Sequence, residues 1–385
     1  MSKIKILHII KTLDLGGAEQ NLLNLVRAGD GRRVDIHVAY SSGGEFEQQF
    51  RDNGVRLFKF SNDAHKLKSP VSFLVIARLA AYVMRNRIDI IHTHTFNAHV
   101  WGAAAAKITG AKLVEHVHDF RYLDPDDFKR RRGASRQYKY VKFLKNVSDK
   151  VIVLTKQNRD FLIKNGLYAP EKVEEIQNGI PLSDDTFNGD HLRNELRRKM
   201  GIGEKDFVIV TPCRIAPEKN LELIMRIAPK VCDKCSNAIF LIYGDGPLLK
   251  EFREQCKDHT IKSKVRMMGF HKEMYDLLRA ADVFLLPSFL ELHSIAALEA
   301  MSMKVPVVIS KDVGCNNEFI NNWDNGVLLD PFSDDDWADT LIKLAENKEL
   351  REIMGKRGYQ LCRERFDIIK NAKAIEGIYA ELDGK

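Results

Sequence analysis

Short apolar runs, many of them rich in β-branched residues, alternate along the chain with longer stretches in which apolar residues recur every three or four positions. The short runs are typical of strands and the longer stretches of amphipathic helices. Strands are predicted at residues 5–10, 35–40, 55–60, 88–92, 112–116, 151–154 and 173–176, and then at 207–211, 239–243, 265–268, 283–286, 305–309 and 327–329. Predicted helices lie between them, including 18–27, 70–85, 97–108 and 156–165.

Alternating strands and helices indicate an α/β fold whose parallel sheets carry helices on both faces. Runs such as 283–286 are apolar throughout, as expected for strands that are covered on both sides. Residues 180–205 are polar and contain several glycines and aspartates, which predicts a linker with a short helix and a domain boundary. We therefore expect two facing Rossmann-like domains, with ligands bound in the cleft at the carboxyl ends of the strands.

The composition is that of an ordinary globular protein of 385 residues, with 44% hydrophobic residues, 24 glycines and 11 prolines. It excludes the collagen-like, low-complexity and disulfide-framework classes. The 60 basic and 53 acidic residues give a mild formal charge of +7, and no nucleic-acid partner is expected from it. No apolar run is long enough for a membrane helix and the first residues lack a secretory signal, so a cytoplasmic protein is expected.

A carboxylate lies inside an apolar helix that is predicted at residues 295–303. Glu299 projects close to the apolar side of this helix, where a carboxylate needs hydroxyls, amides or a cation as partners. Ser294 is suited to cap the helix, which places Glu291 in the turn at its positive end. The two carboxylates suit the hydroxyls of one elongated polar ligand; the alternative is a capping carboxylate and a buried ion pair.

Two cations follow the first strand of the second domain. Arg214 and Lys219 lie in the turn after residues 207–211. A guanidinium fork and a mobile ammonium together suit a diphosphate group. The alternative is a solvated loop in which Glu218 neutralises one of the two cations.

Glycine-containing turns follow other predicted strands. Gly16 and Gly17 separate the first strand from a helix, where backbone amides can approach a phosphate, although a simple tight turn is the alternative. Gly244 and Phe270 lie in turns of the second domain, where backbone groups are suitably placed for a nucleotide base.

His118 follows the strand predicted at residues 112–116 and shares a face with His116, because side chains alternate along a strand. Near neutral pH, His118 can donate or accept a hydrogen bond to a ligand; a purely structural hydrogen bond is the alternative. The histidines lack the spacing of a metal site, and the D-x-D patterns at 124–126 and 334–336 lie in polar loops. No metal is therefore expected.

Together, these residues resemble the retaining glycosyltransferases of family four, which have the GT-B fold. The resemblance extends along nearly the whole chain. It is carried by Gly16-Gly17, His118-Asp119, Asn178-Gly179, Arg214 with Lys219, Gly244-Asp245-Gly246-Pro247, and Glu291 and Glu299 followed by Ala300-Met301. It implies an acceptor-binding domain at residues 1–182, a nucleotide-sugar-binding domain at 183–365, and a C-terminal helix within 366–385 that crosses back to the first domain.

The resemblance also implies roles in the second domain. The residue that matches Glu299 binds the ribose, and the residue that matches Glu291 binds hydroxyls of the transferred sugar. Arg214 and Lys219 stabilise the diphosphate. Such enzymes retain the anomeric configuration without an essential metal or other cofactor, because the leaving phosphate accepts the proton of the acceptor.

In the first domain, the resemblance implies that the backbone at Gly16 and Gly17 assists the diphosphate and that His118 lies beside the sugar and the acceptor. The chain departs from the family where Leu292 is followed by His293 and Ser294, since members commonly have a small–aromatic–small run there. Backbone amides of this run contact sugar and phosphate, and His293 adds a polar side chain. A UDP-hexose or a UDP-N-acetylhexosamine is the expected donor, from its frequency in the family.

The basic segment 129–145, from Lys129 to Lys145, contains eight basic residues, no acid and interleaved aromatic residues. If helical, this segment suits an anionic lipid surface; a solvated basic face is the alternative. We expect a glycan or lipid-linked acceptor of cell-envelope polysaccharide or glycolipid synthesis, used at the inner face of the cytoplasmic membrane. Alternative functions are a nucleotide-sugar epimerase or phosphorylase of the same fold, and a non-catalytic protein that binds anionic surfaces.

Overall fold

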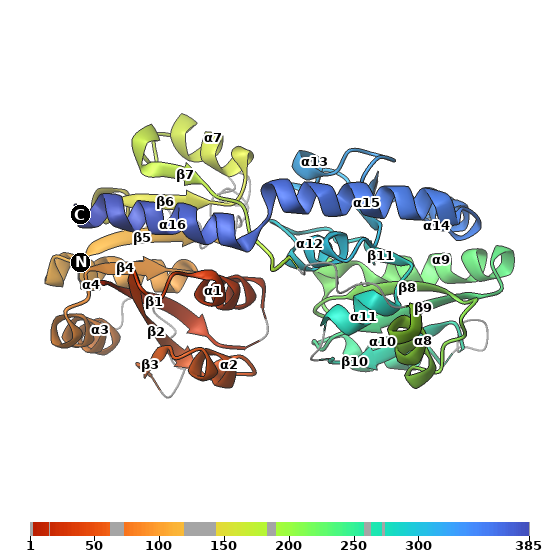
Figure 1. Cartoon of the computed structure of the whole chain (residues 1–385), viewed down its shortest axis with the longest axis horizontal. Helices are drawn as coiled ribbons and strands as arrows, with labels where there is room; N and C mark the ends of the chain where they lie inside the picture. Colours follow the sequence, from red (N-terminus) through yellow and green to blue (C-terminus); the bar gives the residue numbers. More distant parts are fainter. Residues whose placement is uncertain are drawn as a thin grey trace. The chain divides into compact units, whose positions relative to one another are not determined.

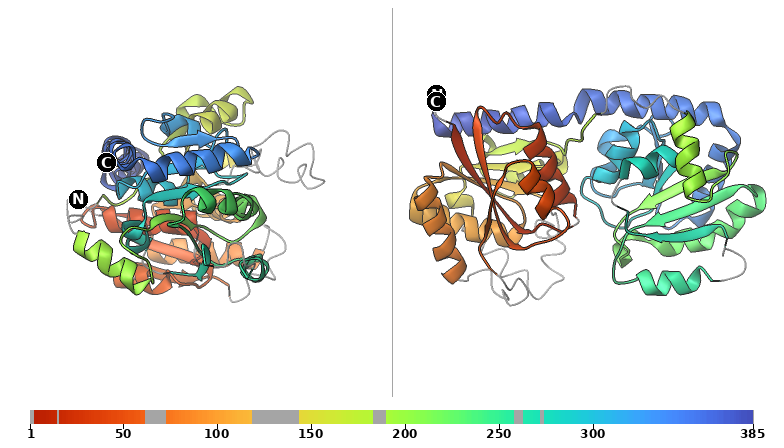
Figure 2. Two further views of the ribbon diagram at one scale, coloured as in Figure 1. Left: turned by 90° about the vertical axis from the view of Figure 1, so that its right-hand side faces the viewer. Right: turned by 60° about the horizontal axis from the view of Figure 1, so that its bottom comes forward.

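The computed structural model describes residues 3–14, 16–61, 73–118, 144–182, 190–257, 263–271 and 274–384. The chain forms two compact units. Unit 1 comprises Met1–Pro181 and Ile368–Lys385, and unit 2 comprises Leu182–Asp367. Each unit is a parallel sheet with helices on both faces (Figures 1 and 2), which confirms the predicted α/β fold class.

The sheet of unit 1 has the strand order β3-β2-β1-β4-β5-β6-β7. Every predicted strand of the first half coincides with one of its strands, because each apolar run is bounded by polar residues that end it. The strands are β1 Ile4–Thr12, β2 Val34–Ser42, β3 Arg56–Lys59, β4 Ile90–Thr93, β5 Lys112–Val117, β6 Lys150–Val153 and β7 Val173–Glu175.

The last helix of the chain belongs to the core of unit 1. Ile375 and Ile378 of this helix, α16, pack with Ile6 and Ile90 on one face of the sheet. The prediction that the final helix crosses back to the first domain is therefore confirmed. The helices of unit 1 are α1 Gly17–Ala28, α2 Glu47–Asp52, α3 Phe73–Asn86, α4 Phe96–Thr109, α7 Lys156–Lys164 and α16 Ile368–Asp383, with a 3₁₀ turn at Pro170–Lys172.

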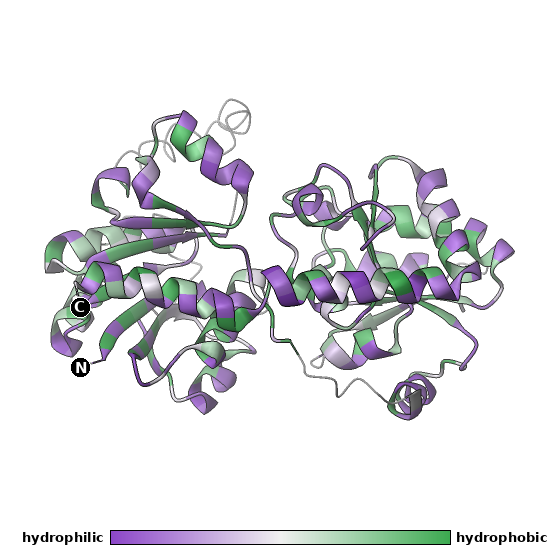
Figure 3. Ribbon diagram, turned by 45° about the horizontal axis from the view of Figure 1, so that its top comes forward, coloured by the Kyte–Doolittle hydropathy of each residue, from purple (hydrophilic) through white to green (hydrophobic). Residues whose placement is uncertain are grey.

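The sheet of unit 2 has the order β10-β9-β8-β11-β12-β13 and also coincides with the predicted strands. These are β8 Phe207–Pro212, β9 Ala238–Tyr243, β10 Val265–Gly269, β11 Val283–Leu286, β12 Val307–Ser310 and β13 Val327–Leu329. The helices are α8 Asp190–Lys199, α9 Leu221–Lys234, α10 Leu249–Gln255, α11 Met274–Ala280, α12 Ile295–Ser302, α13 Asn316–Phe319, α14 Asp334–Glu346 and α15 Lys348–Arg365, with a 3₁₀ turn at Pro217–Lys219. In Figure 3 the strands carry mainly the hydrophobic colour, whereas the helices alternate between hydrophilic and hydrophobic positions.

Most of the basic segment 129–145 lies outside the described residues, which resume at Leu144. Leu144 is buried in the core of unit 1, against α3 and α4, so it does not belong to a membrane-facing surface. None of the helices in the described residues combines the length and the apolar character needed to cross a membrane.

Candidate functional site

The loops after β8 and β11 meet at the carboxyl edge of the sheet in unit 2, because these two strands are neighbours. Lys219 Nζ lies 2.5 Å from Glu291 Oε1 and forms an ion pair with it. Ser288 Oγ donates a hydrogen bond of 2.9 Å to the same carboxylate oxygen. Burial lowers the pKa of Lys219, but the neighbouring Glu291 carboxylate outweighs burial, so that the pKa rises above its ordinary value. Glu291, not Glu218, is thus the partner of Lys219.

Asn220 joins the Arg214–Lys219 loop to its neighbours. Its φ of 52° lies in the left-handed region, and its side-chain amide donates to the carbonyls of Pro287 at 3.0 Å and Pro331 at 3.1 Å. Arg214 is exposed and has no hydrogen-bond or ion-pair partner among the described residues. This guanidinium is therefore available to an anionic ligand.

Two glycines allow the next loop to pass directly against the Arg214 loop. Gly244 has a φ of 135°, and a Cβ atom there would lie 1.9 Å from the carbonyl oxygen of Cys213. A Cβ atom on Gly246 would lie 2.3 Å from the carbonyl oxygen of Ile215. The Gly244 turn thus shapes the backbone beside Arg214. Phe270, in the loop after β10, keeps an exposed side chain at the same edge.

Glu299 lies in α12, where most side chains are buried. Its side chain is 6% exposed, and its carboxylate has no hydrogen-bond or ion-pair partner among the described residues. Burial raises its pKa to about 8. A carboxyl group buried without a partner costs folding free energy. A ligand with hydroxyl groups would supply the missing hydrogen bonds.

Ser294 caps α12, as predicted, since its hydroxyl accepts a hydrogen bond of 3.3 Å from the amide of Ala297. His293 is buried in unit 2, with its ring 5.5 Å from that of Phe319 and 5.3 Å from that of Phe366. Burial lowers the pKa of His293 to about 3. The side chain of His293 is therefore a neutral part of the aromatic core.

Gly314, which the sequence did not single out, supports the Glu291 turn from behind. Its φ is 55°, and a Cβ atom there would lie 2.5 Å from the carbonyl oxygen of Glu291 and 2.4 Å from that of Leu292. The amide of Cys315 donates to the Leu292 carbonyl at 2.9 Å. The loop after β12 thus holds the Glu291 turn in place.

In unit 1, the central strands carry a group of histidines on one face. The parallel register pairs His8 with His92, and the two-residue period of a strand continues this face to the remaining members. The group comprises His8, His92, His94, His116 and His118. Tyr379 of α16 hydrogen-bonds His92 from the helix that covers this face.

A chain of hydrogen bonds connects three of these imidazoles. His118 Nε2 lies 3.1 Å from His94 Nδ1, and His94 Nε2 lies 2.9 Å from His8 Nδ1. Burial lowers the pKa of His118 and of His8 to about 3. His118 is therefore neutral at physiological pH, and its Nδ1 can donate or accept a hydrogen bond but cannot act as a pre-protonated acid.

The nitrogens of His94, His116 and His118 come within 4.8 Å of one another, a proximity that the spacing in the sequence did not predict. Two of these residues already use ring nitrogens in the imidazole chain, so a metal ion would have to replace that hydrogen bond. Of the two D-x-D patterns, 124–126 lies outside the described residues. The other begins α14, where Asp334 pairs with Arg226 at 2.6 Å.

Gly16 is the N-cap of α1 and Gly17 its first residue; Leu15 lies outside the described residues. A buried carboxylate already lies there, since a Cβ atom on Gly16 would be 2.3 Å from Glu19 Oε2. Burial raises the pKa of Glu19 to about 7. A phosphate at this turn would therefore favour the neutral form of Glu19.

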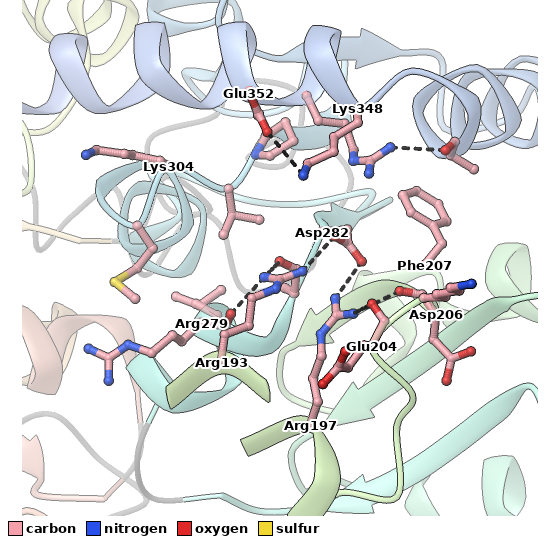
Figure 4. A pocket seen from close by; sticks show the side chains of 18 of the residues that line it. Arg193, Arg197, Glu204, Asp206, Phe207, Arg279, Asp282, Lys304, Lys348 and Glu352 are labelled. Atoms are coloured by element: carbon pink, nitrogen blue, oxygen red, sulfur yellow. Dashed lines mark hydrogen bonds and ion pairs between the residues drawn. The ribbon is translucent and has the colours of Figure 1, made fainter. Parts of the chain in front are cut away.

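Two hollows lie in the described part of unit 2, the first at the amino edge of its sheet and the second against the loop after β11 that carries Glu291. The first has a volume of about 760 Å³. In Figure 4, Arg193 and Arg197 point to Asp282, and each forms an ion pair of 2.7 Å with it. The Asp282 carboxylate is thus shared by the two guanidinium groups. The other hollow, of about 530 Å³, is lined by residues that include Phe289 and Phe332, whose rings stack 5.2 Å apart.

Two family models match the chain, one largely within unit 1 and the other within unit 2. Residues 15–184 match the family described as Glycosyltransferase Family 4, and residues 193–361 match Glycosyl transferases group 1. Together the two matches cover most of the chain.

Similar proteins span nearly the whole length. The Escherichia coli UDP-Gal:alpha-D-GlcNAc-diphosphoundecaprenol alpha-1,3-galactosyltransferase is 25% identical over 99% of this chain and 98% of its own. The Streptomyces kanamyceticus alpha-D-kanosaminyltransferase is 26% identical over 78% of this chain and 81% of its own. The crystal structure of Anabaena HepE in complex with UDP-glucose has the same fold, with a TM-score of 0.83, 21% identity, and coverage of 98% of this chain and 99% of its own.

The fold and the loops at its carboxyl edges define a GT-B glycosyltransferase that acts on a nucleotide sugar. The chain belongs to the family-four glycosyltransferases, as its sequence resemblance indicated.

Proposed function

We propose that this protein transfers a hexose or an N-acetylhexosamine from a UDP-sugar to a glycan or lipid-linked acceptor, with retention and without an essential metal. Unit 2 binds the donor and unit 1 the acceptor. Glu299 accepts hydrogen bonds from the ribose hydroxyls, and Glu291 from those of the sugar. The observation that carries the proposal is the buried, unpartnered carboxyl of Glu299, in the same unit as a loop that presents an exposed guanidinium.

Arg214 and Lys219 stabilise the diphosphate in this proposal. As the bond between the sugar and the phosphate breaks, negative charge develops on the phosphate, and preorganised donors stabilise that charge. Arg214 is free to bind it, and Lys219 is held in position by Glu291. The acceptor hydroxyl forms the new bond on the same face, and its proton passes to the leaving phosphate. His118, neutral in the structure, provides a hydrogen bond to the sugar.

The choice of donor and acceptor is supported by relatives. The Escherichia coli relative is named for UDP-galactose and a diphosphoundecaprenol-linked acceptor, and Anabaena HepE was solved with UDP-glucose. A lipid-linked acceptor of cell-envelope synthesis places the reaction at a membrane surface, which we propose to be its cytoplasmic face. Contact through the segment 129–145 is part of this proposal.

The experiment is a thermal-shift panel of UDP-, GDP-, ADP- and CMP-sugars, because a ligand that binds only the folded state raises the melting temperature. We expect UDP-sugars to stabilise the protein, and Glu299→Gln and Arg214→Ala to remove this effect. Glu218→Gln, a change in the same loop, is the control. Stabilisation of both variants to the wild-type extent would contradict the proposed donor site.

Turnover then tests the reaction itself. Lys219→Ala should lower the rate of transfer about 100-fold or more, since it removes a preorganised donor to the developing charge. NMR of the product should show the anomeric configuration of the donor, and transfer should continue in EDTA. Conversion of the sugar nucleotide in the absence of any acceptor would instead indicate an epimerase.

A further inference from the structure

Helix α3 (Phe73–Asn86) of unit 1 is apolar on two faces, whereas a surface helix ordinarily has one apolar face. Val75, Leu79 and Val83 pack into the core against α4. On the outside, Phe73 is 83% exposed and Leu74 is 70% exposed. The core therefore accounts for only one of the two apolar faces.

The exposed face is continuous along the helix. Met84, three turns after Phe73, is 60% exposed, and Ala77 and Ala81 are exposed between them. The neighbouring helix α4 adds Ile108, which is 62% exposed. Most of the large hydrophobic side chains that are exposed in the described part of unit 1 thus belong to these two helices.

The charged residues that α3 and α4 contribute to this surface are all basic. Helices α3 and α4 contain Arg78, Arg85 and Lys107 and no aspartate or glutamate. Arg78 and Arg85 are exposed on the outer face of α3, and neither pairs with a carboxylate among the described residues. By contrast, α14 begins with three aspartates, and its Asp334 and Asp335 pair with Arg226 and Lys230.

We propose that the outer face of α3, with Ile108 and Lys107 of α4, docks on an anionic phospholipid bilayer. The apolar side chains enter the boundary between headgroups and acyl chains, while the arginines extend to the phosphates. A second copy of this chain is a poorer partner, because α3 and α4 contribute only basic charges to the described part of this face and two such faces would repel each other. Docking would bring the enzyme to a lipid-linked acceptor, and this consequence rests on the proposed function.

The test is co-sedimentation of the full chain with vesicles of phosphatidylcholine containing 30% phosphatidylglycerol, compared with pure phosphatidylcholine. We expect binding to the anionic vesicles and its loss at about 1 M salt, which screens surface charge. Arg78→Ala with Arg85→Ala should weaken binding about 25-fold, at about fivefold per basic residue. Phe73→Ser with Leu74→Ser should also weaken it.

Two matched controls report on charge and on apolar exposure elsewhere. Lys356→Ala with Lys373→Ala removes two exposed cations, and Phe332→Ser removes an aromatic side chain that is 78% exposed in unit 2. Both should sediment as the wild type does. The proposal would be overturned if the wild-type protein does not co-sediment with anionic vesicles. It would also be overturned if the α3 variants bind these vesicles as the wild type does. A dimer that the Phe73 and Leu74 changes dissociate without affecting vesicle binding would overturn it as well.

Transfer to a water-soluble acceptor separates this proposal from the proposed function. The α3 variants should keep that activity, because none of the changed residues belongs to the donor site. Vesicle binding without any sugar transfer by the wild type would refute the proposed reaction and leave the docking surface supported. Sugar transfer without vesicle binding would refute the docking surface and leave the proposed reaction supported.

Discussion

The buried carboxyl of Glu299 is a single residue that indicates a ligand site. It lies in an apolar helix with burial that raises its pKa to about 8, and the described part of the chain gives its carboxylate no partner. Near neutral pH the group is therefore mainly protonated in the free protein. Hydroxyl groups that donate to a carboxylate favour its charged form. Ligand binding and proton release should consequently be coupled at this residue.

We predict that UDP binding at pH 7 releases up to one proton per chain, and that Glu299→Gln abolishes the release. Calorimetry in buffers of different ionisation enthalpy measures this proton directly. Glu115→Gln is the matched control, because Glu115 is a buried carboxyl of unit 1 whose pKa burial raises to about 7. Because a phosphate at the Gly16 turn would favour proton uptake by Glu19, the measurement is repeated in a Glu19→Gln variant. Binding without proton release by that variant would show that Glu299 does not meet the ribose.

Lys219 and Glu291 form an ion pair with each other in the structure. The sequence indicated one as a phosphate ligand and the other as a sugar ligand, and the structure shows that they first bind each other. Removal of either one leaves a charge that is largely buried and has lost its partner. Lys219→Ala should therefore reduce stability as well as turnover, in contrast to the expectation for a free loop cation.

At the scale of elements, the segment that comprises β11, the following loop and α12 is held in place by the loop after β12. Gly314 is the contact point, since its backbone passes within van der Waals distance of Glu291 and Leu292 with no room for a side chain. Ser294 then fixes the start of α12. The position of Glu291 therefore depends on a residue more than 20 positions away in the sequence.

We predict that Gly314→Ala lowers both stability and affinity for the nucleotide sugar. Gly201→Ala is the matched control, because its φ of 66° is similar but nothing comes within 3.9 Å of its Cβ position. The control should cost about 1 kcal/mol in unfolding free energy, the usual penalty of a left-handed alanine, and Gly314→Ala at least about twice that. Urea unfolding and a UDP titration measure the two effects. Equal losses in the two variants would argue against the contact.

At the scale of the whole molecule, the two units differ in their buried titratable groups. In unit 1, burial lowers the pKa values of the five histidines on the strands, from His8 to His118, and also those of His37 and His99. Among the described residues of unit 2, burial lowers the pKa of one histidine, His293. Below pH 6.5 these histidines take up protons in the unfolded chain but not in the folded one. Stability is therefore lost as the pH falls.

Two carboxyls of unit 1 act in the opposite direction. Burial raises the pKa of Glu19 and of Glu115 to about 7, so that between pH 7 and 4.5 they hold protons that the unfolded chain has released. Stability gained from them as the pH falls is smaller than the loss from the more numerous histidines. In unit 2, His293 and Glu299 oppose each other. Acid should therefore destabilise unit 1 first.

We predict that at pH 5 unit 1 unfolds at a lower urea concentration than unit 2, each buried histidine contributing up to about 1.4 kcal/mol per pH unit. All six cysteines lie in unit 2, so labelling with a pyridyl disulfide follows that unit alone, while circular dichroism follows both. At pH 5, part of the circular dichroism change should occur at a lower urea concentration than cysteine labelling, because unit 1 unfolds before unit 2. Coincident transitions that shift together with pH would contradict the prediction.

The amino-acid sequence by itself determined the elements and the residue types of the site. Short apolar runs of three to six residues, bounded by polar ones, are typical of buried strands, so the strands, the sheet class and the positions of Arg214, Glu291 and Glu299 followed from local pattern. The resemblance to family four added the C-terminal helix that returns to unit 1.

Only the tertiary structure decided which side chains meet. The partner of Lys219, the support from Gly314, the imidazole chain from His8 to His118 and the exposure of both Phe73 and Leu74 all depend on contacts between segments far apart in the chain. Local pattern gives each residue a face on its own helix or strand, but the neighbour of that face is set by strand order and loop packing. Those contacts convert a set of suitable residues into a site.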